Sequence, residues 1–185
     1  RTMTPLRIRV YDIALYVDPH AVPATVTDAE PSKILSNSAF WTQLSDPKVP
    51  PVEMALEMVV VRATNGKHMQ HGFDRALIPR VRDAAKAQPE RAPRQMMRGK
   101  DALRRLNKNL LEKNAMPVGT TIVLRFAAGG QCAVWIDGKL FEEIENEALC
   151  WALLDMFTGE KAVSPHAKEG FAEGFARIIA QNQSP

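Results

Sequence analysis

The fold of this chain is read most directly from the stretch Leu6-Arg-Ile-Arg-Val-Tyr-Asp-Ile-Ala-Leu-Tyr-Val17. Its β-branched and aromatic residues predict a strand, which Asp18-Pro19 ends. Because side chains alternate along a strand, Tyr11 and Ile13 share one face and Asp12 belongs to the other. Both faces are largely apolar, which is typical of a central strand covered on each side. A phenol in such a strand needs a hydrogen-bond partner, so Tyr11 is expected to bond either to a neighbouring carbonyl or to a ligand.

The composition is that of an ordinary globular protein. With 185 residues, 45% of them hydrophobic and 24% charged, the chain is expected to form a single domain over residues 1–185. The net charge of +3 is compatible with anionic small ligands or membrane surfaces and does not require nucleic acid. Cys132 and Cys150 lack the spacing of metal ligands, so we expect them to be free, buried thiols.

Two further expectations concern membrane insertion and the start of the chain. No apolar stretch approaches the roughly 18 residues that span a membrane, so we expect no stable membrane insertion. The sequence begins at Arg1 and enters a strand almost at once. We therefore expect that an upstream segment, such as a targeting peptide, has been removed.

The remaining patterns predict an α+β fold with a mostly antiparallel sheet and a layer of helices on one face. A helix is expected over residues 28–44, then a buried strand over 56–62 and a helix from about residue 67 that Pro79 kinks or ends early. A surface loop over 88–95 and a basic helix over 99–114 follow. Strands over 120–127 and 131–136 form a hairpin, and a short strand follows around 140–141. Helices over 145–157 and 164–181 complete the chain, with Ser164-Pro165 opening the last one.

No motif in the chain predicts a metal, a cofactor or a nucleic acid as a partner. His68 and His71 lie three residues apart on a predicted helix, but no third ligand is near them in the sequence. The basic helix over 99–114 lacks the aromatic side chains that stack bases, so its cations are expected on a solvated helix face. Gly170 and Gly174 lie one turn apart in the last helix, which favours close packing against a neighbour.

Several segments resemble the chalcone isomerase-like superfamily. Arg9-Val-Tyr-Asp-Ile-Ala-Leu-Tyr-Val17 is similar to the first core strand of that superfamily. The most specific match is Ala148-Leu-Cys-Trp-Ala-Leu-Leu-Asp-Met-Phe-Thr-Gly159 followed by Ala162-Val-Ser-Pro165, because a helix ending in glycine before Val-Ser-Pro is characteristic of the family. Further matches, in the family's order, are Met58–Arg62, Phe73–Arg80, Gly119–Phe126 and Ile136–Gly138. The resemblance implies a chalcone isomerase-like fold over nearly the whole chain.

Within this superfamily the resemblance favours a member that is not an enzyme. True isomerases carry a threonine where Tyr11 stands, and a tyrosine near the start of the helix expected from residue 67. The chain has only two tyrosines, Tyr11 and Tyr16, so the second of these groups is absent. The isomerase threonine or serine late in the penultimate helix corresponds to Met156. These differences imply a pocket more apolar than that of an isomerase.

Fatty-acid-binding members of the superfamily hold a carboxylate with an arginine just before the first strand and a tyrosine within it. Tyr11 matches the tyrosine, and Arg1 matches the arginine by position. Arginine offers planar paired donors and a permanent charge, while the phenol adds a neutral donor. We therefore expect a fatty-acid ligand whose acyl chain lies between the sheet and the helices, in a pocket lined by Ile13, Phe73, Leu77, Leu153 and Met156.

Two alternatives stay open at this point. One is an isomerase-type enzyme, an intramolecular lyase, that acts on small phenolic or enone substrates. The other is an accessory protein that binds an unidentified biosynthetic enzyme. The resemblance further implies a role in fatty acid metabolism and a location in the plastid, the chloroplast stroma, because plant and algal fatty-acid-binding relatives are plastid proteins. The mitochondrion is the alternative location, because fungal relatives are mitochondrial.

Overall fold

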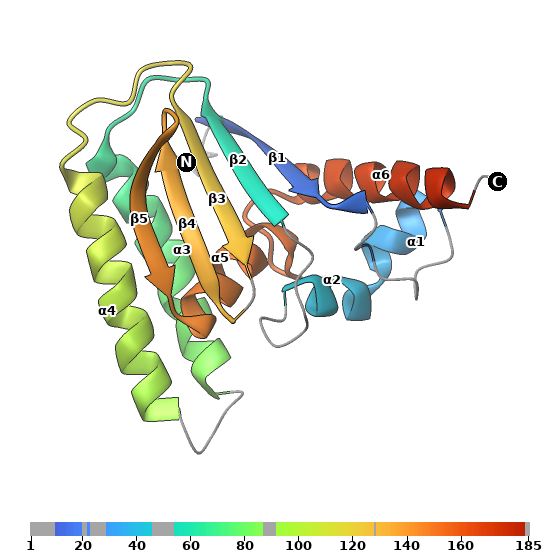
Figure 1. Ribbon diagram of the computed structural model, residues 1–185, viewed down its shortest axis with the longest axis horizontal. Helices are drawn as coiled ribbons and strands as arrows, with labels where there is room; N and C mark the ends of the chain where they lie inside the picture. The colour runs from blue at the N-terminus through green and yellow to red at the C-terminus, as the bar shows by residue number, and fades with distance from the viewer. Residues whose placement is uncertain are drawn as a thin grey trace, which may run out of the picture.

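A five-stranded antiparallel sheet organises the structure (Figure 1). The computed structural model of the chain describes residues 10–19, 22, 29–45, 54–86, 92–127 and 129–183. The strands are neighbours in the sheet in the order in which they occur in the sequence. They are β1 (Tyr11–Val17), β2 (Met54–Val60), β3 (Thr121–Ala127), β4 (Gln131–Ile136) and β5 (Lys139–Glu145).

Six helices accompany the sheet within the described residues. They are α1 (Pro31–Ser36), α2 (Ser38–Ser45), α3 (Gly66–Lys86), α4 (Ala92–Leu111), α5 (Glu147–Thr158) and α6 (Pro165–Asn182). Figure 1 shows α3, α4 and α5 layered together beside β2 to β5, whereas α6 runs along β1 with α1 next to it. The helices at the two edges of the sheet therefore differ: α6 lies beside β1, and α4 lies beside β5.

Alternation of side chains explains why one face of the sheet is covered. In β2 every second residue is buried, and the residues between them are half-exposed. The register continues this buried face into β3 and β4. Its members are Met54, Leu56, Met58, Val60, Ile122, Leu124, Phe126, Cys132, Val134 and Ile136. A period of two with one apolar face is what an antiparallel sheet under a helical layer requires, so the predicted α+β fold is confirmed.

The first strand differs from the prediction in its place in the sheet. β1 pairs only with β2, from Tyr11 opposite Val60 to Val17 opposite Met54, so it is an edge strand and not a central one. Its outer face is open to water at Tyr16, whose side chain is 54% exposed and donates a hydrogen bond of 2.8 Å to Glu57. The apolar content of both faces misled the prediction, because a tyrosine can face solvent with its hydroxyl paired. Residues 6–9 of the predicted strand lie outside the described residues.

Pro79 does not end α3, which continues to Lys86. The flanking side chains Leu77 and Val81 are buried to 0% and 1% exposure. Burying two such side chains contributes roughly 1.5–3 kcal/mol each, which offsets the cost of about 3 kcal/mol for an internal proline. Tertiary packing therefore overrides the local signal at this position.

Other element boundaries also shift. The helix expected over 28–44 is divided at Asn37, whose side-chain oxygen accepts a hydrogen bond of 3.0 Å from Phe40 N and so begins α2. α4 begins at Ala92, inside the expected loop, and β5 runs over seven residues, longer than predicted. α5 begins at Glu147 because Asn146 caps it, with its side chain 2.9 Å from Leu149 N. The cap predicted for α6 is confirmed, since Ser164 accepts from Ala167 N at 3.2 Å.

Substitution of two glycines in α3 by alanine should have opposite effects on stability. A Cβ at Gly66 would overlap the backbone carbonyl of Leu110, whereas a Cβ at Gly72 meets nothing within 4 Å. We expect Gly66→Ala to lower the free energy of unfolding by about 3 kcal/mol, because backbone cannot move aside cheaply. Gly72→Ala, the matched control, should raise it by about 0.5–1 kcal/mol through helix propensity. Urea denaturation of both variants measures the difference, and equal effects would contradict the packing of α3 on the end of α4.

Candidate functional site

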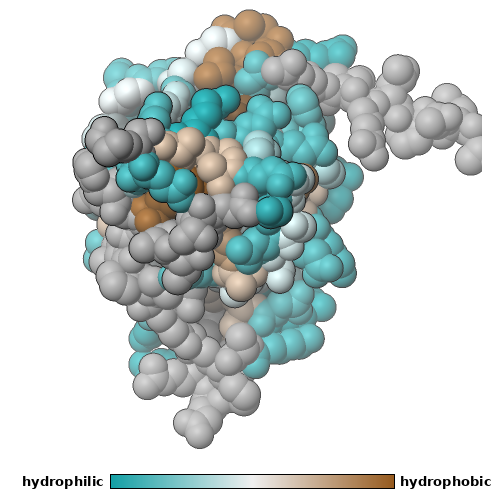
Figure 2. Space-filling view, turned by 90° about the vertical axis from the view of Figure 1, so that its right-hand side faces the viewer, coloured by the Kyte–Doolittle hydropathy of each residue, from teal (hydrophilic) through white to brown (hydrophobic). Residues whose placement is uncertain are grey.

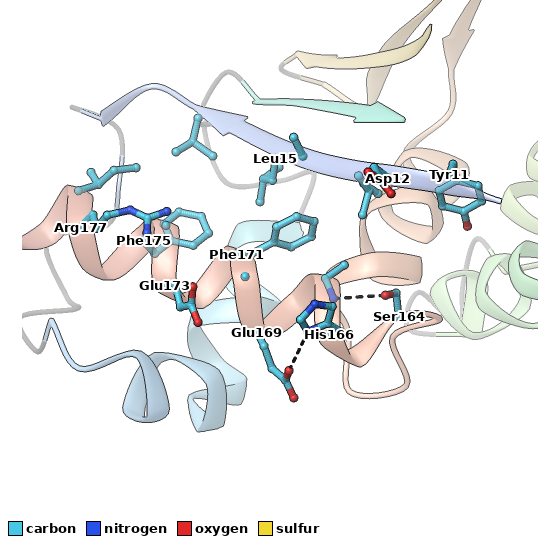
Figure 3. A pocket seen from close by; sticks show the side chains of 17 residues that line it. Tyr11, Asp12, Leu15, Ser164, His166, Glu169, Phe171, Glu173, Phe175 and Arg177 are labelled. Atoms are coloured by element: carbon cyan, nitrogen blue, oxygen red, sulfur yellow. Dashed lines mark hydrogen bonds and ion pairs between the residues drawn. The ribbon is translucent and has the colours of Figure 1, made fainter. Parts of the chain in front are cut away.

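A groove of about 730 Å³ lies between β1 and α6 (Figure 3). β1 contributes the side chains of its inner face together with Asp12 and Ala14, and α6 contributes aromatic, small and charged residues from the facing side. The volume falls within the 300–1,000 Å³ typical of ligand sites. Its walls include Tyr11, Ile13 and Leu15 of β1 and Gly170, Phe171 and Gly174 of α6.

The edge position of β1 makes this groove possible. In the described part of the chain no further strand pairs with β1, and α6 runs beside it (Figure 1). At the far end of the strand the side-chain amide of Asn182 donates a hydrogen bond of 3.0 Å to the carbonyl of Pro19. This hydrogen bond therefore links the end of α6 to the chain just after β1, and it holds the two walls of the groove together.

Two glycines widen the groove on the side of α6. Gly170 and Gly174 lie four residues apart, so they are on one face of the helix, and both line the groove. A Cβ added at Gly170 would meet nothing within 4 Å, and one at Gly174 would meet only the guanidinium of Arg177, at 4.0 Å. The prediction that these glycines serve close helix packing is therefore wrong. They leave space where larger side chains would fill the groove.

An aromatic cluster fixes the position of α6. The ring of Phe175 packs edge-on against Phe40, with centroids 4.9 Å apart, and against Trp41, at 5.8 Å. Trp41 is held in turn by a hydrogen bond of 3.0 Å from Nε1 to the carbonyl of Ile34. Such edge-to-face pairs contribute roughly 0.5–1.5 kcal/mol each beyond their buried area. α1 and α2 therefore act as a support that places Phe175 in the groove.

Tyr11 provides a directed donor at one end of the groove. Its ring packs edge-on against the buried Phe157, with centroids 6.4 Å apart. Figure 3 shows its hydroxyl pointing away from β1, and within the described residues this hydroxyl has no hydrogen-bond partner. Burial raises the pKa of the Tyr11 phenol above its ordinary value, so the group keeps its proton at neutral pH. A protonated phenol without a partner can donate to a ligand.

Charged side chains lie along the rim of the groove, on α6. His166, Glu169, Glu173 and Arg177 follow one another along the helix, and Figure 3 shows Arg177 at the end opposite Tyr11. His166 Nδ1 lies 3.4 Å from Glu169 Oε2. The groove thus combines apolar side chains with three carboxylates, those of Asp12 beside Tyr11 and of Glu169 and Glu173 on α6. This arrangement fits an elongated, mostly apolar ligand whose polar group lies at an end.

A charge network that the sequence reading missed positions the segment leading into α6. Arg80 Nε lies 2.9 Å from Asp155 Oδ2, and the same guanidinium donates to the carbonyls of Ala76 and Lys161. Burial raises the pKa of the Asp155 carboxyl, and the charge of Arg80 opposes that rise. The signal in the sequence was a single acid in an apolar helix, Leu-Leu-Asp155-Met-Phe. This network links α3 to the end of α5, close to Ser164, which lines the groove.

The predicted site residues fall into three groups. Tyr11 and Ile13 line the groove. Four others, Phe73, Leu77, Leu153 and Met156, are core residues with no more than 4% exposure, and they do not line it. Their contact with a ligand stays a prediction. Arg1 lies outside the described residues. The sequence reading missed the α6 residues, because nothing in the apolar spacing of the last helix says which strand it lies beside.

Metal ligands, membrane-spanning helices and cysteines were the other features to consider in the described residues. No three histidine, cysteine, aspartate or glutamate side chains gather there in a way that could hold a metal ion. None of the helices in those residues is both long and apolar enough to cross a membrane. Cys132 and Cys150 are free and buried, as predicted, and Cys150 Sγ donates a hydrogen bond of 3.1 Å to the carbonyl of Gly130.

Comparison with known proteins identifies the family. The chain belongs to the chalcone isomerase-like family, whose model matches residues 1–172. The fold is similar to the crystal structure of an Arabidopsis thaliana fatty-acid binding protein, with a TM-score of 0.72 and 20% sequence identity over 97% of this chain and 85% of that chain. A search of curated proteins by sequence found no match. The resemblance noted in the sequence and the chalcone isomerase-like fold are therefore confirmed.

Filling the groove should separate ligand binding from stability. Gly170→Leu places a branched side chain in the groove, so we expect an apolar fluorescent dye to bind at least tenfold more weakly. The same change should raise the free energy of unfolding by about 0.8 kcal/mol, because leucine is a better helix former than glycine. Gly72→Leu on α3 is the matched control and should give the same stability gain with unchanged dye binding. Equal dye affinity in both variants would show that the dye binds elsewhere.

Proposed function

We propose that this protein binds fatty acids without catalysing a reaction on them. The acyl chain lies in the groove between β1 and α6, and the carboxylate lies at the Tyr11 end, where Arg1 supplies the opposite charge. The observation that carries the proposal is a groove with apolar side chains from both β1 and α6 that ends at a protonated tyrosine hydroxyl with no partner in the described residues. The similar Arabidopsis structure is of a fatty-acid binding protein, which supports the same class of ligand.

The dimensions of the groove suit a long alkyl chain. The seven residues of β1 extend over roughly 20 Å at about 3.3 Å per residue, which is comparable with the length of a long-chain fatty acid. Each methylene removed from water contributes about 0.8 kcal/mol. Contacts along Leu15, Phe171 and Phe175 therefore supply most of the affinity, and the head group mainly sets the orientation.

The family resemblance, and not the charge of the groove, sets the proposed orientation of the ligand. A carboxylate in an apolar groove must be paired or it takes up a proton. Asp12, Glu169 and Glu173 are carboxylates that line the groove, and Arg177 is a cation at the end opposite Tyr11, so these charges alone do not place a carboxylate at Tyr11. We place it at Tyr11 because the family resemblance matches Tyr11 and Arg1 to the residues that hold a carboxylate. The exposed end near Arg177 then takes the tail or the solvent-exposed part of a longer chain.

The isomerase alternative is less well supported. Of the two tyrosines in the chain, Tyr16 lies on the outer face of β1, where it bonds to Glu57. Tyr11 is therefore the one phenol available to the groove, and the second polar group expected of an isomerase has no counterpart. We extend the proposal to a role in fatty acid metabolism in the plastid, with the mitochondrion as the alternative. Both locations rest on the family resemblance.

The head-group contacts predict different losses of affinity. Arg1→Ala should weaken fatty-acid binding by roughly 2–4 kcal/mol, because the anion loses its counter-charge. Tyr11→Phe should weaken it by about 1–2 kcal/mol, because one donor is lost while the ring still packs on Phe157. Isothermal titration calorimetry with a saturated fatty acid measures both values.

The matched fatty alcohol is the control ligand, since it carries no anion. Its affinity should change little in either variant. If the acid and the alcohol bind equally to the wild-type protein, Arg1 and Tyr11 do not hold a carboxylate and the proposed function is wrong.

A further inference from the structure

Exposed apolar side chains gather at the end of the molecule where β1 begins. Residues 61–65 and 112–119, with Leu111 at the end of α4, form this tip. Val118 is 64% exposed, Leu111 46% and Val61 37%. The tip is at the top of the molecule in Figure 1, and Figure 2 shows hydrophobic surface at the top of the molecule.

Backbone hydrogen bonds make the tip an ordered extension of the sheet. Gly119 N donates to the carbonyl of Val60 at 2.8 Å, and Thr64 and Met116 exchange two bonds of 3.0 and 2.9 Å. On the other side, Val61 N donates to the carbonyl of Val10 at 2.9 Å. Because Tyr11 follows Val10, the tip lies next to the Tyr11 end of the groove.

The position of Val118 in a turn has no explanation within the fold. Thr120 N donates to the carbonyl of Pro117 at 3.1 Å, and Gly119 has a φ of +91°, so Val118 occupies the second position of a tight turn. Such turns usually carry proline, glycine or polar residues. A valine that is 64% exposed there adds little to the core. Val118 therefore adds apolar surface to the outside of the tip, together with Val61 and Leu111.

The tip and its surroundings carry a small excess of positive charge, with three cations and two carboxylates. Arg62 and Lys67 are exposed, and Lys113 is half-buried beside them in the second loop. The nearby carboxylates are Glu112 and Asp137, and that of Asp137 accepts a hydrogen bond of 3.0 Å from the backbone N–H at the start of β3. Cations around a small apolar surface match the headgroup region of an anionic bilayer, where apolar insertion and electrostatic attraction add together.

We propose that the tip docks on an anionic lipid surface, with Val61 and Val118 at the level of the headgroups and Arg62 and Lys67 against the lipid phosphates. Docking in this way places the Tyr11 end of the groove beside the bilayer. The inference deepens the proposed function, and it rests on that function only for the identity of the cargo. A protein partner fits less well, because a few exposed side chains fall far short of the roughly 800 Å² per partner of a stable interface.

The outer face of α4 provides a matched control surface. It carries exposed cations, among them Arg98 and Lys108, and the exposed Met97. Figure 1 shows α4 on the side of the sheet away from β1 and α6. Removing two cations and the apolar side chain there lowers the net charge by two. Removing Arg62 and Lys67 at the tip lowers it by the same amount, but the α4 change leaves the tip intact.

The test is flotation of the protein with vesicles of phosphatidylcholine and with vesicles of an equimolar mixture of phosphatidylcholine and phosphatidylglycerol. The wild-type protein should float with the mixed vesicles only, and less so as salt rises. Val61→Ser with Val118→Ser, and separately Arg62→Gln with Lys67→Gln, should each lower the partition coefficient about tenfold or more. The α4 variant Met97→Ser with Arg98→Gln and Lys108→Gln should float like the wild type. All changed side chains are exposed, and circular dichroism confirms folding.

Three results would overturn the inference. They are no flotation of the wild-type protein, flotation of the tip variants equal to that of the wild type, or a loss of flotation in the α4 variant larger than in the tip variants. Titration with fatty acid in the absence of vesicles keeps the two proposals apart. The tip variants should bind fatty acid in solution like the wild type, and a loss there would mean that the tip acts on the groove and not on a membrane. A wild-type protein that floats with mixed vesicles but binds no fatty acid in solution would support the docking surface and contradict the proposed function.

Discussion

The pairing register of β1 with β2 is the constraint on which the site depends. With Tyr11 opposite Val60, the side chains of Tyr11, Ile13, Leu15 and Val17 all lie on the face that the sheet turns toward the helices. A slip of one residue would move every one of them to the open face. The same register leaves the far edge of β1 without a strand in the described residues, and α6 occupies that position. The groove is therefore a consequence of an apolar edge strand covered by a helix.

The core and the groove use the helices in different ways. α3 and α5 fill the space beneath the sheet so closely that Phe73, Leu77 and Met156 have almost no exposed surface. α6 instead presents two glycines to β1 and is held at a distance by the aromatic cluster around Phe175. Free space persists along α6 where Gly170 and Gly174 stand in place of larger side chains.

The sequence predicted which helices and strands form better than it predicted which of them lie side by side. The family, the fold class, the hairpin of β3 and β4 and the Ser164 cap were all available from local patterns and resemblance. Local patterns do not specify which strand lies at an edge, so β1 was placed wrongly at the centre. Tyr11 and Ile13 could be selected because the strand periodicity is strong. Phe171 and the glycine face of α6 could not, because their role arises only when the last helix meets the first strand.

The location of the acyl chain is tested most directly with a fatty acid that carries a photoreactive diazirine near the middle of its chain. After irradiation, mass spectrometry of the digested protein identifies the labelled residues. The account predicts labels on β1 and α6, at Leu15, Phe171 or Phe175, and competition by unlabelled fatty acid. Labels confined to Phe73, Leu77, Leu153 or Met156 would place the chain beneath the sheet and contradict the groove as the binding site.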